Sequence, residues 1–156
     1  MALNGEPVFQ FGPLDQGWFP DGLYTAPTDD ALKYDVEMAR EYGFNMIRKH
    51  MKVESDRWYW HCDRLGLLVW QDMPSYAIHA KYGDWIADGY DMGNEFPASD
   101  GAKANFYKEW SEIIAGLKKF QCIVCWVPFN EAWGQFDTKD VVAFTYAMPF
   151  SARTAT

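Results

Sequence analysis

An asparagine and a glutamate, Asn130 and Glu131, follow directly on an apolar run at residues 123–129. The run is typical of a buried strand, and ligands bind at the carboxyl ends of parallel strands in α/β proteins. Four aromatic residues surround the pair: Trp126, Phe129, Trp133 and Phe136. A partly dry pocket formed by these rings would raise the pKa of a carboxyl group, which suits a general acid. An ordinary strand followed by an acidic loop would give the same pattern.

The elements that must position this pair begin with a helix and strand in the first third of the chain. The helix is predicted to start after Thr28, where two aspartates favour the positive helix end, and to stop at Gly43. A strand at residues 44–48 follows at once. Three apolar residues recur at helical spacing and are predicted to form the buried face of this helix: Leu32, Val36 and Ala39.

The same design recurs along the chain. A second helix is predicted between Ser55 and Gly66, and a strand at residues 67–70 follows it. An opening strand is predicted at residues 8–11, and a fourth helix near Thr138. The third helix is identified by an apolar stripe: Phe106, Trp110, Ile113, Ile114 and Leu117. Strands alternating with helices predict a parallel sheet covered by helices.

The connections that follow the strands are long, at residues 12–27 and 73–102. Long loops at the carboxyl ends of strands are typical of a functional face. The second loop is rich in ring-bearing residues: Tyr76, His79, Tyr82, Trp85, Tyr90 and Phe96. These side chains would either wall a ligand site or pack on one another.

Composition excludes some classes of function. The chain has 156 residues, enough for one core, and a net charge of -8 with a pI near 4.7. So acidic a chain is a poor partner for nucleic acid or for an anionic membrane surface. The aromatic fraction of 18% suits flat amphipathic ligands such as sugars, although packing alone also explains many rings.

Cofactor motifs are equally informative. The three cysteines, Cys62, Cys122 and Cys125, have no metal-ligand spacing and are expected to be reduced and mostly buried. Neither a metal-binding motif nor a phosphate-binding glycine loop follows any strand, so no metal or other cofactor is expected. No signal peptide and no apolar run of membrane-spanning length is visible, which leaves the cellular compartment unknown.

Four segments together resemble the catalytic domain of glycoside hydrolase family 2, the group of β-galactosidases, β-glucuronidases and β-mannosidases. They lie at residues 3–8, 41–50, 62–69 and 123–131, and they recur in the order found in the family. The resemblance extends from residue 3 to about residue 138. It implies a retaining β-glycosidase built on a (β/α)8 barrel.

The resemblance also implies roles for individual residues. Glu131 falls on the position of the general acid/base, and Asn130 on the neighbour that hydrogen-bonds the sugar 2-hydroxyl. Arg48 and His50 match residues that line the sugar subsite, and Asp72 faces the same pocket by position. Trp133 is a further candidate for contact with the substrate. A structural ion pair at Arg48, a core position for His50 and a loop-holding role for Asp72 are the alternatives.

A complete barrel of this kind needs about 250 residues and eight strands. The sequence therefore predicts a partial barrel, about the first four βα units, with parallel strands and outer helices. We expect residues 1–145 to form this half and residues 146–156 to be an atypical, disordered or loosely packed tail. Exposed half-barrel edges would favour pairing of the chain with itself.

Retaining hydrolysis needs a second carboxylate about 5–5.5 Å from the first. In the family this nucleophile lies on strand seven, which the four predicted strands do not include. We therefore expect a β-glycosidase fragment that is inactive or weakly active by itself, unless Asp72, another loop carboxylate or a second chain substitutes. The alternative is a non-catalytic carbohydrate-binding or structural half-barrel.

Overall fold

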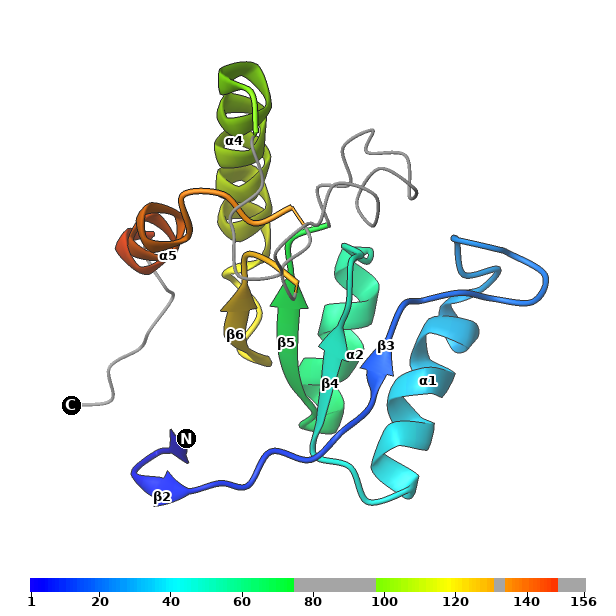
Figure 1. Cartoon of the computed structure of the whole chain (residues 1–156). Helices are drawn as coiled ribbons and strands as arrows, with labels where there is room; N and C mark the ends of the chain where they lie inside the picture. The colour runs from blue at the N-terminus through cyan, green and yellow to red at the C-terminus, as the bar shows by residue number, and fades with distance from the viewer. Residues whose placement is uncertain (75–97, 131–133, 149–156) are drawn as a thin grey trace, which may run out of the picture.

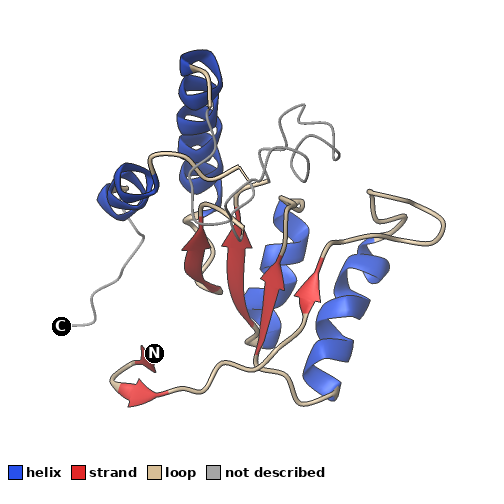
Figure 2. Cartoon of the chain, viewed as in Figure 1, coloured by secondary structure: helices blue, strands red, loops and turns tan. Residues whose placement is uncertain are grey.

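The computed structural model describes residues 1–74, 98–130 and 134–148, and its centre is a four-stranded parallel sheet (Figures 1 and 2). The strand order β3-β4-β5-β6 follows the chain order. A short antiparallel hairpin, β1 with β2, precedes the sheet. The strands are β1 (Ala2–Leu3), β2 (Glu6–Pro7), β3 (Leu14–Asp15), β4 (Met46–Lys49), β5 (Leu68–Asp72) and β6 (Ile123–Val127). The helices are α1 (Asp29–Glu41), α2 (Asp56–Leu65), α4 (Asp100–Leu117) and α5 (Thr138–Ala147).

The predicted alternation of strands and helices is confirmed from β3 onward, and every neighbouring pair in the four-stranded sheet is parallel. Side chains on one face of the strands, such as Ile47 and Val69, are buried against the helices. On the opposite face Arg48 and Trp70 stay partly exposed. In Figure 1, α2 lies behind β4 and β5, and no helix of the described part covers the front of these two strands. The arrangement is compatible with part of a (β/α)8 barrel.

The predicted position of the first strand, residues 8–11, is wrong. Phe9 and Phe11 are exposed, and the sheet begins instead at β3. The segment before β3 runs alongside β4, where Pro13 O accepts a hydrogen bond from Arg48 N at 3.0 Å. A Cβ atom on Gly12 would lie 1.7 Å from the carbonyl oxygen of Met46. Position 12 therefore has room only for glycine, a constraint that the hydrophobic pattern does not show.

The helix boundaries confirm the predicted caps, with one exception. Thr28 Oγ1 accepts a hydrogen bond from Ala31 N at 3.1 Å, which satisfies a free amide at the start of α1. Gly66 ends α2 with φ of 68°, a left-handed conformation that glycine adopts without strain. Ser55 occupies the N-cap of α2 but makes no side-chain cap bond there.

The predicted apolar stripe of the third helix is confirmed in α4, where Ile113 is only partly buried. The predicted boundary at residue 146 lies inside α5, which extends to Ala147. Residues 149–156 and all six aromatic or histidine residues named in the long second loop lie outside the described residues. No helix in the described ranges is long and apolar enough to cross a membrane.

Candidate functional site

Four of the six predicted site residues lie together at the carboxyl ends of β4, β5 and β6. Arg48 donates to both oxygens of Asp72, from Nε to Oδ1 at 3.0 Å and from Nη2 to Oδ2 at 2.9 Å. The same Nη2 donates to Asn130 Oδ1 at 3.1 Å. His50 Nδ1 lies 2.6 Å from Asp72 Oδ2. We call these four residues the strand-end cluster.

Asp72 is the centre of the strand-end cluster. Its side chain is 2% exposed, and both carboxylate oxygens are engaged by Arg48, one of them also by His50. A bidentate arginine–carboxylate pair is strong and geometrically specific, so Asp72 fixes the orientation of both basic side chains. Arg48 therefore has the ion-pair partner that was one of the predicted alternatives, and its side chain stays 25% exposed on the open side of the sheet.

The contact with Arg48 also determines how Asn130 is oriented. An arginine only donates hydrogen bonds, so the Asn130 atom facing it must be the carbonyl oxygen. The amide NH2 group therefore points away from Arg48. The backbone oxygen of Asn130 accepts from Gln135 Nε2 at 3.1 Å, which connects the two sides of the segment at residues 131–133.

Three of the aromatic residues expected to surround Glu131 pack against α4. The Trp126 ring contacts Trp110 of α4 edge-on, with centroids 5.7 Å apart. Phe129 stacks on Phe106 of α4 at 5.1 Å, and Phe136 contacts Phe106 edge-on at 5.1 Å. These three rings anchor the end of β6 to α4. Glu131 itself lies outside the described residues, so the aromatic pocket around it stays a prediction.

Behind the strand-end cluster, a buried glutamine connects the strand ends to a helix. Gln71 is fully buried, and its Nε2 donates to Lys52 O and to Asp72 O, both at 2.8 Å. Its Oε1 accepts from the hydroxyl of Tyr59 in α2 at 2.6 Å. All of its polar atoms are thus used to hold the backbone at the ends of β4 and β5 in place.

A second buried polar group lies beside Gln71 on the helix-covered face. The Lys49 side chain is 1% exposed, and its Nζ lies 2.5 Å from Asp15 and 3.2 Å from Glu54. The ammonium also lies 4.1 Å from the ring centre of Trp58. A buried charge needs such partners, so these contacts join the ends of β3 and β4 to the start of α2.

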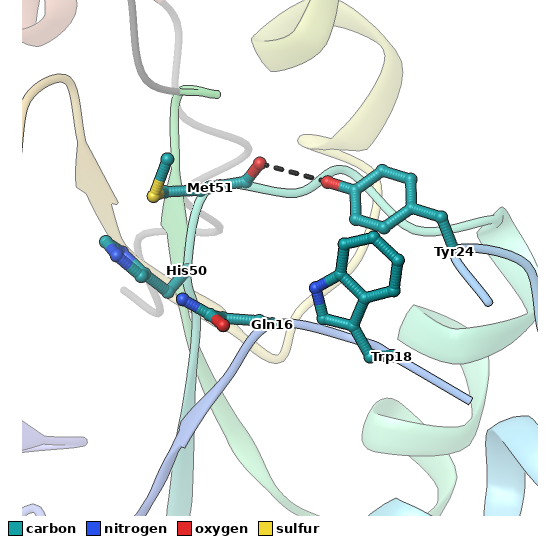
Figure 3. A pocket seen from close by; sticks show the side chains of 5 residues that line it. All are labelled: Gln16, Trp18, Tyr24, His50 and Met51. Carbon is teal, nitrogen blue, oxygen red and sulfur yellow. Dashed lines mark hydrogen bonds between the residues drawn. The ribbon is translucent and has the colours of Figure 1, made fainter. Parts of the chain in front are cut away.

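A cavity of about 270 Å³ opens next to the strand-end cluster (Figure 3). It lies beyond the ends of β3 and β4, and its lining residues are Gln16, Trp18, Tyr24, His50 and Met51. His50 belongs to both the cavity and the cluster. The long loop at residues 12–27 was predicted from the sequence, but a role for its aromatic rings was not. The signal that identifies them is the presence of Trp18 and Tyr24 in a loop that follows a strand.

The cysteines agree with the prediction of reduced thiols, because none of the three forms a disulfide. Cys62 and Cys122 are buried, whereas Cys125 is only partly buried on β6. Burial raises the pKa of the Cys125 thiol, and the nearby Asp72 carboxylate raises it further. The thiol is therefore neutral near the cluster. Within residues 1–74, 98–130 and 134–148, no three His, Cys, Asp or Glu side chains gather as a metal site.

Glu131 and Trp133, the remaining predicted site residues, lie outside the described residues. Their sequence neighbour Asn130 is described: it follows β6 and belongs to the strand-end cluster. The roles assigned to all six residues stay predictions.

Comparison with known proteins finds no matching family model. The chain is 26% identical over 153 residues to a β-mannosidase of Capra hircus, covering 92% of the chain and 15% of that protein. It is 21% identical over 159 residues to a β-galactosidase of Streptococcus thermophilus, covering 92% and 14%. Among solved structures, a β-glucuronidase from Ruminococcus gnavus aligns with a TM-score of 0.70 at 18% identity, covering 94% of the chain and 24% of that structure.

The fold is therefore a parallel α/β arrangement similar to the aligned part of that β-glucuronidase structure, and it is compatible with a partial barrel. The proteins that the chain resembles are enzymes of glycoside hydrolase family 2, so the resemblance predicted from the sequence is confirmed. The chain spans only about one-seventh of the length of these two curated relatives.

Proposed function

We propose that the chain is part of a retaining β-glycosidase and carries its general acid/base, Glu131, beside a sugar-binding cluster. The observation that supports this most strongly is the bonding of Arg48, Asp72 and Asn130 across three adjacent strand ends. Strand carboxyl ends are where catalytic groups gather in (β/α)8 barrels. The resemblance to β-mannosidases and a β-galactosidase supports the same class of reaction.

In this proposal the cluster binds the sugar whose glycosidic bond is broken. Asn130, oriented by Arg48, donates its amide NH2 to a sugar hydroxyl. Arg48 keeps a 25% exposed side chain, so it presents its remaining donors to the ligand. Glu131 follows Asn130 in sequence, gives its proton to the glycosidic oxygen and later activates the attacking water.

The reaction also needs a nucleophilic carboxylate about 5–5.5 Å from the acid/base. Asp72 is the candidate within the cluster, and it is poorly suited to this task. Both of its oxygens accept strong hydrogen bonds, and its side chain is 2% exposed. Attack by either oxygen would break part of the bidentate pair with Arg48. We therefore expect little or no turnover by the 156-residue polypeptide alone, and a nucleophile supplied from outside the four described strands.

The proposal is tested by calorimetric titration with the methyl β-glycosides of mannose, galactose and glucuronic acid. We expect at least one to bind, and Asn130→Ala to weaken that binding by about tenfold, the loss of one good hydrogen bond. A second variant, Glu131→Gln, removes the proposed acid/base and is used in the catalytic measurement. Its matched control is Glu41→Gln, at the exposed end of α1. Absence of binding by all three glycosides would refute the sugar site.

Catalysis is measured separately with nitrophenyl β-glycosides. We expect any residual hydrolysis to vanish in Glu131→Gln and to persist in Glu41→Gln. Hydrolysis that persists in Glu131→Gln would remove the acid/base assignment. Robust turnover that depends on Glu131 would instead support the assignment and contradict the expected inactivity of the polypeptide alone.

A further inference from the structure

The loop between β3 and α1 exposes two large aromatic side chains to solvent. Trp18 is 62% exposed and Tyr24 is 46% exposed. Their ring centres lie 4.9 Å apart with an interplanar angle of 52°, so together they form an angled apolar surface (Figure 3). Leaving two adjacent rings exposed sacrifices the free energy that their burial would yield, which is typical of a binding surface.

The two rings belong to an ordered wall. The Tyr24 hydroxyl donates to Met51 O at 3.3 Å. The buried Lys52 lies with Nζ 4.5 Å from the Tyr24 ring centre, and the same Nζ donates to Gly17 O at 2.7 Å. Lys52 thus joins the loop after β3 to the loop after β4, so the aromatic surface is formed before any ligand arrives.

Backbone conformation at the rim also supports a functional role. Leu23 and Met51, neither of them glycine, have φ of 53° and 59°. Such left-handed conformations are uncommon for these residue types and are concentrated at functional sites. One of these residues lies in each of the two loops that border the cavity, directly beside Tyr24 and His50.

The cavity and the strand-end cluster share one side chain. His50 uses Nδ1 for Asp72 and also lines the cavity beside Gln16. Arg48, on the strand that leads into His50, bonds both Asp72 and Asn130, so the cluster is closely bonded and His50 is the side chain through which it adjoins the cavity. The cavity extends from there towards β3. A ligand in the cavity would therefore contact His50 at the edge of the cluster, next to a sugar bound there.

We propose that Trp18 and Tyr24 form a second carbohydrate subsite, which stacks the sugar ring adjoining the one bound by the strand-end cluster. Sugar rings combine an apolar C–H face with hydroxyl groups at the edge. The two aromatic faces match the first, and the polar side chains of Gln16 and His50 match the second. The ligand is therefore a β-linked oligosaccharide of at least two units. This inference rests on the proposed function, since it requires the first sugar to occupy the cluster.

The test compares disaccharides with monosaccharides on the intact chain. Mannobiose and lactose are titrated calorimetrically, each beside the methyl β-glycoside of its non-reducing sugar. We expect one disaccharide to bind about tenfold more tightly than its methyl glycoside, as one aromatic contact of about 1.4 kcal/mol would give. Trp18→Ala should abolish that difference while leaving the affinity for the methyl glycoside unchanged.

Trp60→Ala is the matched control, because Trp60 is 41% exposed on α2 and is not among the residues that line the cavity. Tyr24→Phe keeps the ring but removes the bond to Met51 O, and it should retain most of the disaccharide preference. Equal binding of both ligand classes, or an unchanged preference in Trp18→Ala, overturns the second subsite and leaves the proposed function standing. Failure of every sugar to bind overturns both.

Discussion

Replacing Asp72 by asparagine tests how far the strand-end cluster depends on one buried charge. Asn has the same shape, but it offers one acceptor and an NH2 group where Arg48 and His50 both meet a carboxylate. Removing one partner of a buried ion pair costs about 3–5 kcal/mol. Arg48 is 25% exposed and regains some hydration, so we expect a loss of about 2–4 kcal/mol in the free energy of unfolding.

The assay is urea unfolding followed by tryptophan fluorescence, with the melting temperature as a second measurement. For a chain of this length the loss corresponds to a decrease of roughly 5–15 °C. Asp56→Asn is the matched control, because Asp56 pairs with Lys119 in water, with side chains 62% and 56% exposed. Exposed pairs contribute about 0–1 kcal/mol. If Asp72→Asn costs no more than Asp56→Asn, the cluster is not held by the buried charge and the reasoning is refuted.

Two further substitutions test local features. Burial raises the pKa of Asp35, and the charges of Asp15 and Glu54 raise it further. The folded state therefore favours the protonated acid, so Asp35→Asn should stabilise the protein at neutral pH. Urea unfolding measures this gain, which should disappear as the pH falls from the raised pKa of folded Asp35 towards the ordinary value of 3.8. A gain that does not depend on pH would contradict the mechanism. Thr28→Ala should lower the free energy of unfolding by about 1 kcal/mol, because it removes the α1 cap bond. Ser55→Ala, where no side-chain cap bond exists, should change it by less than about 0.5 kcal/mol. Equal losses in the two variants would show that the cap bond contributes nothing.

Helix positions and strand order were predictable because they depend on local chemistry. Thr28 and Gly66 mark a helix start and a helix end through backbone bonding that neighbouring residues determine. The first strand was not predictable in this way. Phe9 and Phe11 suggest burial, yet they are exposed and pairing begins at Leu14, with Arg48, a residue that is distant in sequence.

The candidate site shows the same division. The positions of Arg48, Asp72 and Asn130 at strand ends followed from the alternation of elements, so their proximity was predictable. The bidentate geometry was not, because it depends on register between strands. The stacking of Phe129 on Phe106 of α4 was not predictable either, because it joins two segments that are distant in sequence.

The amide of Gln71 has a consequence for how sequence change would affect ligand recognition. It lies one layer behind the cluster, yet it holds the Asp72 backbone through a chain of bonds that begins at Tyr59 in α2. Substitutions in the helical layer would therefore shift the Asp72 backbone from a distance. Under the proposed function, such changes would alter sugar affinity without any contact with sugar.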